Sequence, residues 1–181
     1  MESIVVLDYD PKWPAVFLRL STRIKTVVGD IAVAIEHVGS TSVPGLAAKP
    51  IIDMSVVIAS EGELPQAIEK LATLDYVHRG NLGVDGREAF FNPPRSPSHH
   101  LYVCPAGSLG LRNHLAVRDY LREHSDTARA YGKLKKRLAE ECGDDIDTYI
   151  DGKTDFILQI LAKTDLSPHE LELIEAANRK A

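Results

Sequence analysis

Cysteines are scarce in this sequence: its 181 residues include two, Cys104 and Cys142. Two cysteines exclude a disulfide framework and a four-cysteine zinc site. Long apolar runs are also missing, because no stretch approaches the ~18 residues that span a bilayer. The N-terminus lacks the basic flank and the apolar length of a signal peptide. We therefore expect a cytoplasmic protein that does not bind a membrane.

The sequence also has no excess of positive charge. It carries 21 Lys and Arg against 26 Asp and Glu, a formal net charge of −5, and its pI is about 5.8. This balance gives no overall basic field, which excludes bulk nucleic-acid binding. The apolar content of 44% excludes disorder as the main state. We expect a single domain over residues 1–181.

Charge is nevertheless unevenly distributed along the chain. Residues 109–137 contain eight basic and three acidic residues, whereas 138–151 contain six acidic residues and no basic one. The first segment therefore offers a local cationic site for an anionic ligand. A second interpretation stays open, in which the two segments form solvated helix faces that neutralise each other.

The apolar pattern predicts an α+β fold, with an α/β part over residues 1–105 and a helical part over 106–181 packed on it. The segment 50–59 is rich in β-branched residues and is predicted to be a buried strand. In chain order we expect a helix over 13–28, strands over 32–38 and 50–59, a helix over 63–74, strands over 76–78, 88–92 and 99–104, and helices from 109 onward with breaks near 125, 143 and 167.

The most informative stretch is EHVGSTSVPG, residues 36–45, which is followed by Lys49 and Asp53. Gly39 allows close backbone approach, and the hydroxyl and N–H groups of the next three residues suit phosphate oxygens. Asp53 on the following strand is placed to hold a divalent cation such as Mg²⁺ that bridges those phosphates. The stretch therefore predicts a phosphate-binding loop beside a carboxylate.

The same residues carry a family resemblance. Gly-Ser followed about a dozen residues later by an Asp on an apolar strand resembles the nucleotidyltransferase superfamily, and IEHVGSTSVPGLAAKPIIDMSVVI is similar to the GrpB-like family. The resemblance runs from Tyr9 to about residue 163. The later segments that agree with the family are HHLYV, RDYLREH, Tyr131 with Leu134-Lys135, and Tyr149 with Lys153-Phe156. It implies a nucleotidyltransferase-like mixed β-sheet with flanking helices and a C-terminal helical extension, in a domain also found fused to dephospho-coenzyme-A kinase.

The carboxylate set of that superfamily is incomplete here. A second acid usually follows two residues after the first, so that both point the same way along the strand, but this position is Ser55. The neighbouring strand offers His100 and Tyr102 where a third acid is expected. Glu36, Glu88 or a histidine stay open as replacements. With one clear carboxylate, two-metal phosphoryl transfer is poorly supported.

A second cluster of candidate residues lies on the predicted helix after residue 109. His114, Arg118 and Arg122 are spaced four residues apart, so they share one helix face. Guanidinium groups match phosphate geometry well, and Tyr131 and Lys135 repeat the spacing on the next helix. The competing interpretation is structural, with Arg118 and Arg122 paired to acids of the 138–151 segment so that they pin the tail to the sheet.

Other chemistries have weaker support. A zinc site built from Asp53, His37 and the pair His99-His100 is disfavoured, because adjacent strand residues face opposite sides. The cysteines have no visible His or Asp partner, so cysteine nucleophilic catalysis is disfavoured. Ser40 and Ser42 lack the G-x-S-x-G elbow of a serine hydrolase.

The leading hypothesis is a protein that handles a nucleotide or another small phosphorylated ligand, as a nucleotidyl- or phosphoryl-transferase with an incomplete carboxylate set. Asp53 is its catalytic residue and the ligand of Mg²⁺. The alternative is a non-catalytic domain of the same fold that binds a ligand or a protein partner. The predicted ligand-binding residues are Gly39, Ser40, Thr41, Ser42, Lys49, His100, Arg118, Arg122 and Lys135.

Overall fold

The computed structural model describes residues 3–179. Its strands are β1 (Ala32–Val38), β2 (Ile52–Ile58), β3 (Val77–Gly80), β4 (Glu88–Phe91) and β5 (His99–Pro105). Its helices are α1 (Trp13–Val28), α2 (Leu64–Ala72), α3 (Leu109–Glu123), α4 (Ser125–Cys142), α5 (Ile146–Leu161) and α6 (Pro168–Asn178), with short 3₁₀ turns at Ser40–Ser42 and Glu61–Glu63.

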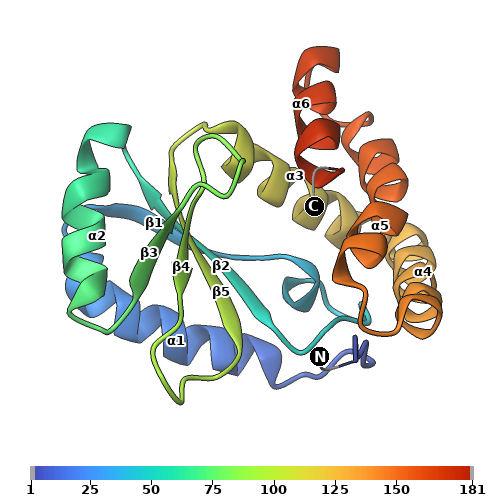
Figure 1. Ribbon diagram of the computed structural model, residues 1–181, viewed down its shortest axis with the longest axis horizontal. Helices are drawn as coiled ribbons and strands as arrows, with labels where there is room; N and C mark the ends of the chain where they lie inside the picture. Colours follow the sequence, from blue (N-terminus) through green and yellow to red (C-terminus); the bar gives the residue numbers. More distant parts are fainter. Residues whose placement is uncertain (1–2, 180–181) are drawn as a thin grey trace.

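The five strands form one mixed sheet in the order β1-β2-β5-β4-β3. The central strands β2 and β5 are parallel, and the other neighbouring pairs are antiparallel. Helices α1 and α2 lie on one side of the sheet, and α3 to α6 lie on the other (Figure 1). The expected α+β fold with a mixed sheet and C-terminal helices is confirmed.

Side chains of strand β2 point alternately to the two faces of the sheet, one of which packs on the core of α1 and α2. Met54, Val56 and Ile58 are fully buried against α1 and α2, and each contributes roughly 1.5–3 kcal/mol by leaving water. The alternate residues Asp53 and Ser55 face α3 and the C-terminal helices, because side chains alternate along a strand. The buried strand predicted over 50–59 therefore carries its one carboxylate on the sheet face that α3 to α6 cover.

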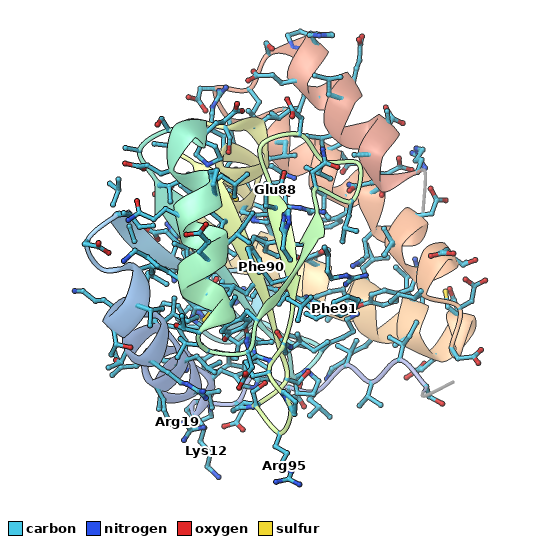
Figure 2. The ribbon with its side chains drawn as sticks, turned by 60° about the vertical axis from the view of Figure 1, so that its left-hand side comes forward. Lys12, Arg19, Glu88, Phe90, Phe91 and Arg95 are labelled. Carbon is cyan, nitrogen blue, oxygen red and sulfur yellow. The ribbon has the colours of Figure 1, made fainter. Side chains whose placement is uncertain are left out.

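Strand β4, which lies between β5 and the edge strand β3, shows the same alternation. Phe90 is 5% exposed in the core cluster, whereas Phe91 is 55% exposed on the opposite face (Figure 2). Glu88 shares a face with Phe90, and its carboxylate receives a 2.6 Å hydrogen bond from His78. Glu88 therefore lies on the face away from Asp53 and does not replace a missing acid there.

The helical part begins where the sequence predicts it. Strand β5 ends at Pro105, and α3 begins at Leu109 with the Ser108 hydroxyl as N-cap. The breaks between the C-terminal helices fall at His124, Gly143 and Ser167. That the chain forms one domain stays a prediction. Within residues 3–179 the structure contains no helix long and apolar enough to cross a membrane.

Candidate functional site

The loop after β1 passes directly over the carboxylate of Asp53. Val38 pairs with Asp53 across the antiparallel strands β1 and β2. Gly39 then adopts a φ of +67°, and a Cβ there would lie 2.2 Å from Oδ2 of Asp53. Glycine therefore meets a conformational and a steric requirement at once. The Ser42 hydroxyl donates a 2.6 Å hydrogen bond to the Gly39 carbonyl and closes the turn.

Asp53 is oriented by a histidine on the neighbouring strand. The parallel register places His100 of β5 beside Asp53, and His100 Nδ1 lies 2.8 Å from Oδ1 of Asp53. Burial alone would raise the pKa of Asp53, but the His100 hydrogen bond and nearby positive charges hold this pKa below its usual range. A carboxylate only accepts hydrogen bonds, so Nδ1 of His100 carries the proton and Nε2 is left free.

Three lysines from separate segments surround this carboxylate. Lys135 of α4 is 2% exposed, and its Nζ donates to Ser40 Oγ at 2.7 Å and to the Ala47 carbonyl at 2.5 Å. Lys153 of α5 makes no ion pair within residues 3–179. The third, Lys49, precedes β2. All three are near enough to Asp53 for its charge to affect their pKa values.

Their environment disfavours the charged form of each lysine. Burial, followed by repulsion from Lys153 and Lys49, lowers the pKa of Lys135 to about 7. Burial and repulsion from Lys49 lower the pKa of Lys153 to about 8. Burial also lowers the pKa of Lys49, against the attraction of Asp53. A negatively charged ligand would relieve this repulsion.

Two tyrosines support the lysine side chains. Lys135 Nζ lies 4.6 Å from the ring centre of Tyr131, and Lys153 Nζ lies 4.4 Å from that of Tyr149. Both pairs have the i, i+4 spacing that places side chains together on one helix face. This spacing predicted Lys135 as a ligand contact. Tyr149 and Lys153 were named only for the family resemblance and were not predicted as site residues, although they have the same spacing on α5.

These side chains line one cavity of about 240 Å³, which we call the lysine pocket. Of the residues predicted to bind the ligand, five line it together with the predicted catalytic Asp53, while Gly39 and Ser42 lie in the adjoining turn. The lining comprises Ser40, Thr41, Ala48, Lys49, Ile51, Asp53, His100, Tyr131, Lys135, Tyr149, Ile150 and Lys153.

Arg118 and Arg122 do not line the lysine pocket. Arg118 Nη1 donates to Glu36 Oε2 at 2.6 Å and to the His37 carbonyl at 3.2 Å, so it ties α3 to β1. Arg122 donates twice to the Ser42 carbonyl, at 2.9 and 3.1 Å. Both guanidinium groups hold α3 against protein groups. Pairing with acids of the 138–151 segment is wrong, because Arg118 pairs with Glu36 and Asp119 instead. That the two arginines contact a ligand stays a prediction.

The residues around Asp53 do not fit a resident metal ion. Ser55, at the position of a second acid, is fully buried, and its hydroxyl lies 3.3 Å from His114 Nδ1. Glu36 is paired with Arg118. No group of three His, Cys, Asp or Glu side chains suited to a metal occurs within residues 3–179. One carboxylate among three lysines instead suits a ligand that brings its own negative charge.

His37, His99 and Cys104 make contacts within the protein's interior. His37 lies 3.0 Å from the Thr41 hydroxyl and stacks on Phe17, while His99 is buried 2.7 Å from the Tyr76 hydroxyl. Neither reaches the Asp53 carboxylate as a shared metal ligand. Cys104 is fully buried, and burial raises its pKa to about 11, which disfavours the reactive thiolate.

The amino-acid sequence of this chain is similar to those of known bacterial proteins. The chain is 38% identical to UPF0157 protein YqkA of Bacillus subtilis over 154 residues, which are 85% of this chain and 45% of YqkA. It thus spans less than half of that relative. It is 27% identical over 168 residues to a dephospho-CoA kinase of Mycolicibacterium paratuberculosis, covering 78% of this chain and 41% of the kinase.

Matches to solved structures and to a family model show which protein family the chain belongs to. The crystal structure of the conserved protein GrpB from Enterococcus faecalis matches with a TM-score of 0.78 and 33% identity, over 95% of this chain and 98% of the other. Cid1 poly(U) polymerase with MgGTP bound matches at 0.48 and 18%, over 74% and 44% of the chains, too distant to indicate activity. The model of the GrpB protein family matches residues 3–163. The chain belongs to the GrpB family.

Proposed function

We propose that this protein binds a small phosphorylated molecule, such as a nucleotide, in the lysine pocket. The observation that carries the proposal is the convergence of Lys49, Lys135 and Lys153 on one cavity that contains a single carboxylate, Asp53. Three ammonium groups that repel one another gain most from a ligand with several negative charges. Polyphosphates meet this requirement better than a monocarboxylate does.

The neighbouring groups add directional contacts to this charge. Ser40 Oγ accepts the hydrogen bond from Lys135, which leaves its own O–H free to donate to a phosphate oxygen. Tyr131 and Tyr149 present rings beside the ammonium groups and supply apolar walls. A phosphate held here would contact α4, α5 and the 39–42 turn together. The ligand would therefore strengthen the packing of the helical part on the sheet.

Mg²⁺ enters this proposal as the counter-ion of the ligand. Mg²⁺ sites commonly combine one or two carboxylates with phosphate oxygens and water. Asp53 supplies one carboxylate at the floor of the pocket, so a magnesium–nucleotide complex would gain one protein ligand. The lysine ammonium groups would neutralise phosphate charge in place of a second metal ion, for which Ser55 and Tyr102 provide no carboxylate.

A second candidate function is phosphoryl or nucleotidyl transfer. The specific observation in its favour is the Asp53–His100 pair, which leaves Nε2 of His100 free at the pocket. This nitrogen would accept the proton of an attacking hydroxyl group, while the lysines stabilise charge on the phosphate oxygens. If transfer does not occur, the same pocket serves as a non-catalytic binding site.

Ligand binding is tested by thermal unfolding with ATP, ADP, coenzyme A, dephospho-coenzyme A, pyrophosphate and phosphate, each with and without Mg²⁺. At 100 times Kd a ligand stabilises the fold by about 2.7 kcal/mol, which raises Tm by roughly 5–10 °C for this chain length. The Lys135→Met variant is expected to lose about 100-fold in affinity. Lys133→Met, an exposed lysine on the same helix, is the matched control.

The outcomes separate binding from transfer. No Tm shift with any of these ligands, or equal shifts for the wild type and Lys135→Met, would contradict the binding proposal. Turnover of magnesium–ATP is followed by phosphorus NMR in the wild type, Asp53→Asn and His100→Gln. Equal background signals in all three would rule out transfer and leave the binding site standing.

A further inference from the structure

A second cavity lies between the 83–87 loop, α3 and α6, and His114 is part of its lining. Its volume is about 170 Å³, slightly larger than an engineered apolar cavity of ~150 Å³ that holds benzene. One wall is apolar and comes from both helices; it comprises Leu109, Leu173, Ile174, Ala176 and Ala177. The polar lining includes Arg87, Asn113 and His114.

Arg87 is the unusual residue of this cavity. Its Nε–H is the one buried side-chain polar group without a hydrogen-bond partner in the part of the chain that the structure describes. Its guanidinium group lies 4.8 Å from the ring centre of Tyr102, and no described carboxylate lies within ion-pair distance of it. The enclosed Nε is not reachable from the cavity, but the Arg87 side chain makes no hydrogen bond within residues 3–179, so its terminal Nη groups have unused capacity to bind an anion.

The backbone around Arg87 is tightly packed. Gly86 has a φ of +66°, and a Cβ there would lie 2.6 Å from Cβ of Ser108. A Cβ on Gly110 would lie 2.8 Å from Cβ of Arg87. The Ser108 hydroxyl also donates a 2.9 Å hydrogen bond to the Gly86 carbonyl. These contacts place Arg87 against the start of α3, which reduces the entropy that it would lose on binding a ligand.

The opposite wall, α6, is held by ion pairs at both of its ends. Arg112 of α3 pairs with Glu170 at the start of α6. Arg179, just after α6, pairs with Asp151 at 2.6 Å and Asp155 at 2.5 Å on α5. Helix α6 follows residue 163, where the match to the family model ends. The cavity is therefore closed by a segment that lies outside that match.

We propose that Arg87 and the apolar wall of α6 form a second ligand site, for a small carboxylate with an apolar body such as an aromatic or branched aliphatic acid. The planar guanidinium fork matches a carboxylate in two parallel hydrogen bonds. The apolar wall suits a group of about benzene size. A single arginine fits one negative charge, in contrast with the three lysines of the lysine pocket.

The lining also explains why other ligands fit less well. Burial lowers the pKa of His114 to about 4, so this residue is neutral near pH 7 and adds no second positive charge. Asp85 lines the cavity from an exposed position and disfavours highly charged anions such as polyphosphates. Asn113 offers an amide that can hydrogen-bond with the second edge of a carboxylate. The site therefore selects for low charge and an apolar body.

The test is an NMR titration of the full chain with benzoate, with benzyl alcohol as the neutral ligand of similar shape. Benzoate is expected to shift amide signals of residues 83–87 and α6 and to bind at least about tenfold more tightly than benzyl alcohol. Arg87→Gln is expected to weaken benzoate binding by about tenfold or more. Arg129→Gln, an exposed arginine on α4, is the matched control.

A second variant keeps the test independent of Arg87. Ala177→Leu fills the cavity from α6 without changing any charge and is expected to abolish benzoate binding. The proposal is overturned if benzoate does not bind, if its signal changes map elsewhere, or if both variants bind it as the wild type does. Because Lys135→Met leaves this cavity intact, benzoate binding by that variant separates this site from the lysine pocket.

Discussion

The arginines of α3 and the lysines of the lysine pocket are both cationic, but their surroundings differ. Arg118 is paired with Glu36 and Asp119, and Arg122 donates to a backbone carbonyl. Lys153 has no ion pair within residues 3–179, and Lys135 donates only to neutral oxygens. Paired charge holds elements together, whereas unpaired, buried charge destabilises the free protein and is available to a ligand. An ion-pair partner therefore distinguishes Arg118 from the lysines, whereas Arg122 and Lys135 both donate to neutral oxygens and differ in that only Lys135 lines the lysine pocket.

The largest effect is expected where a paired cation is removed. Arg118→Met leaves Glu36 half-buried without its partner, so the free energy of unfolding is expected to fall by about 2–3 kcal/mol. Urea unfolding followed by circular dichroism measures this change. The exposed pair Arg129–Asp126 is the control, since Arg129→Met should change stability by less than about 0.5 kcal/mol. Loss of phosphate-ligand binding without loss of stability would place Arg118 in the ligand site instead.

A change of pH should act on the lysines and leave the arginines charged. Folded-state pKa values of about 7 for Lys135 and about 8 for Lys153 lie below the usual value of 10.5. Between pH 7 and 9 the unfolded chain therefore binds more protons than the folded chain, and stability rises with pH.

The expected gain from pH 7 to pH 8 is about 1–2 kcal/mol for the free protein, measured by urea unfolding at each pH. The double variant Lys135→Met, Lys153→Met should lose most of this gain. A wild-type protein that is equally stable at both pH values would show that the lysines keep their ordinary pKa values, and that the pocket does not strain the fold.

The smallest effect is expected for an unpaired cation. Lys153→Met removes a partly buried charge but keeps an apolar side chain on α5, so the free energy of unfolding should rise by about 1 kcal/mol at pH 7. The same variant should bind a polyphosphate less tightly than the wild type. Thermal unfolding with and without pyrophosphate measures both changes. A Lys153→Met protein that is less stable than the wild type would give Lys153 a structural role like that of Arg118.

The sequence predicted the centre of the site from local features. Gly39 and Asp53 were identified because a glycine turn and a strand carboxylate at this spacing imply close approach, and the structure brings them into contact. The alternation that separates His99 from His100 was also predictive, since His99 is buried and His100 reaches Asp53. These features depend on strand geometry, which is regular enough to be inferred without knowledge of the fold.

The features that were missed depend on how distant elements pack. The spacing of Arg118 and Arg122 showed that they share a helix face, but it did not show that this face meets Glu36 and the Ser42 carbonyl. Lys153 joins the pocket because α5 packs beside α4, a contact that no local pattern specifies. Arg87 reaches its cavity through a loop packed against the start of α3, which is equally non-local.

The turn at Gly39 has a mechanical consequence. Because its backbone passes where a Cβ would lie 2.2 Å from the Asp53 carboxylate, the turn cannot move closer to the start of β2. Lys135 fastens the same turn to α4 through Ser40. A force applied at the pocket is thus transmitted to the sheet and to the helical part at the same time. The turn therefore connects the sheet to the helical part through contacts with Asp53 and Lys135.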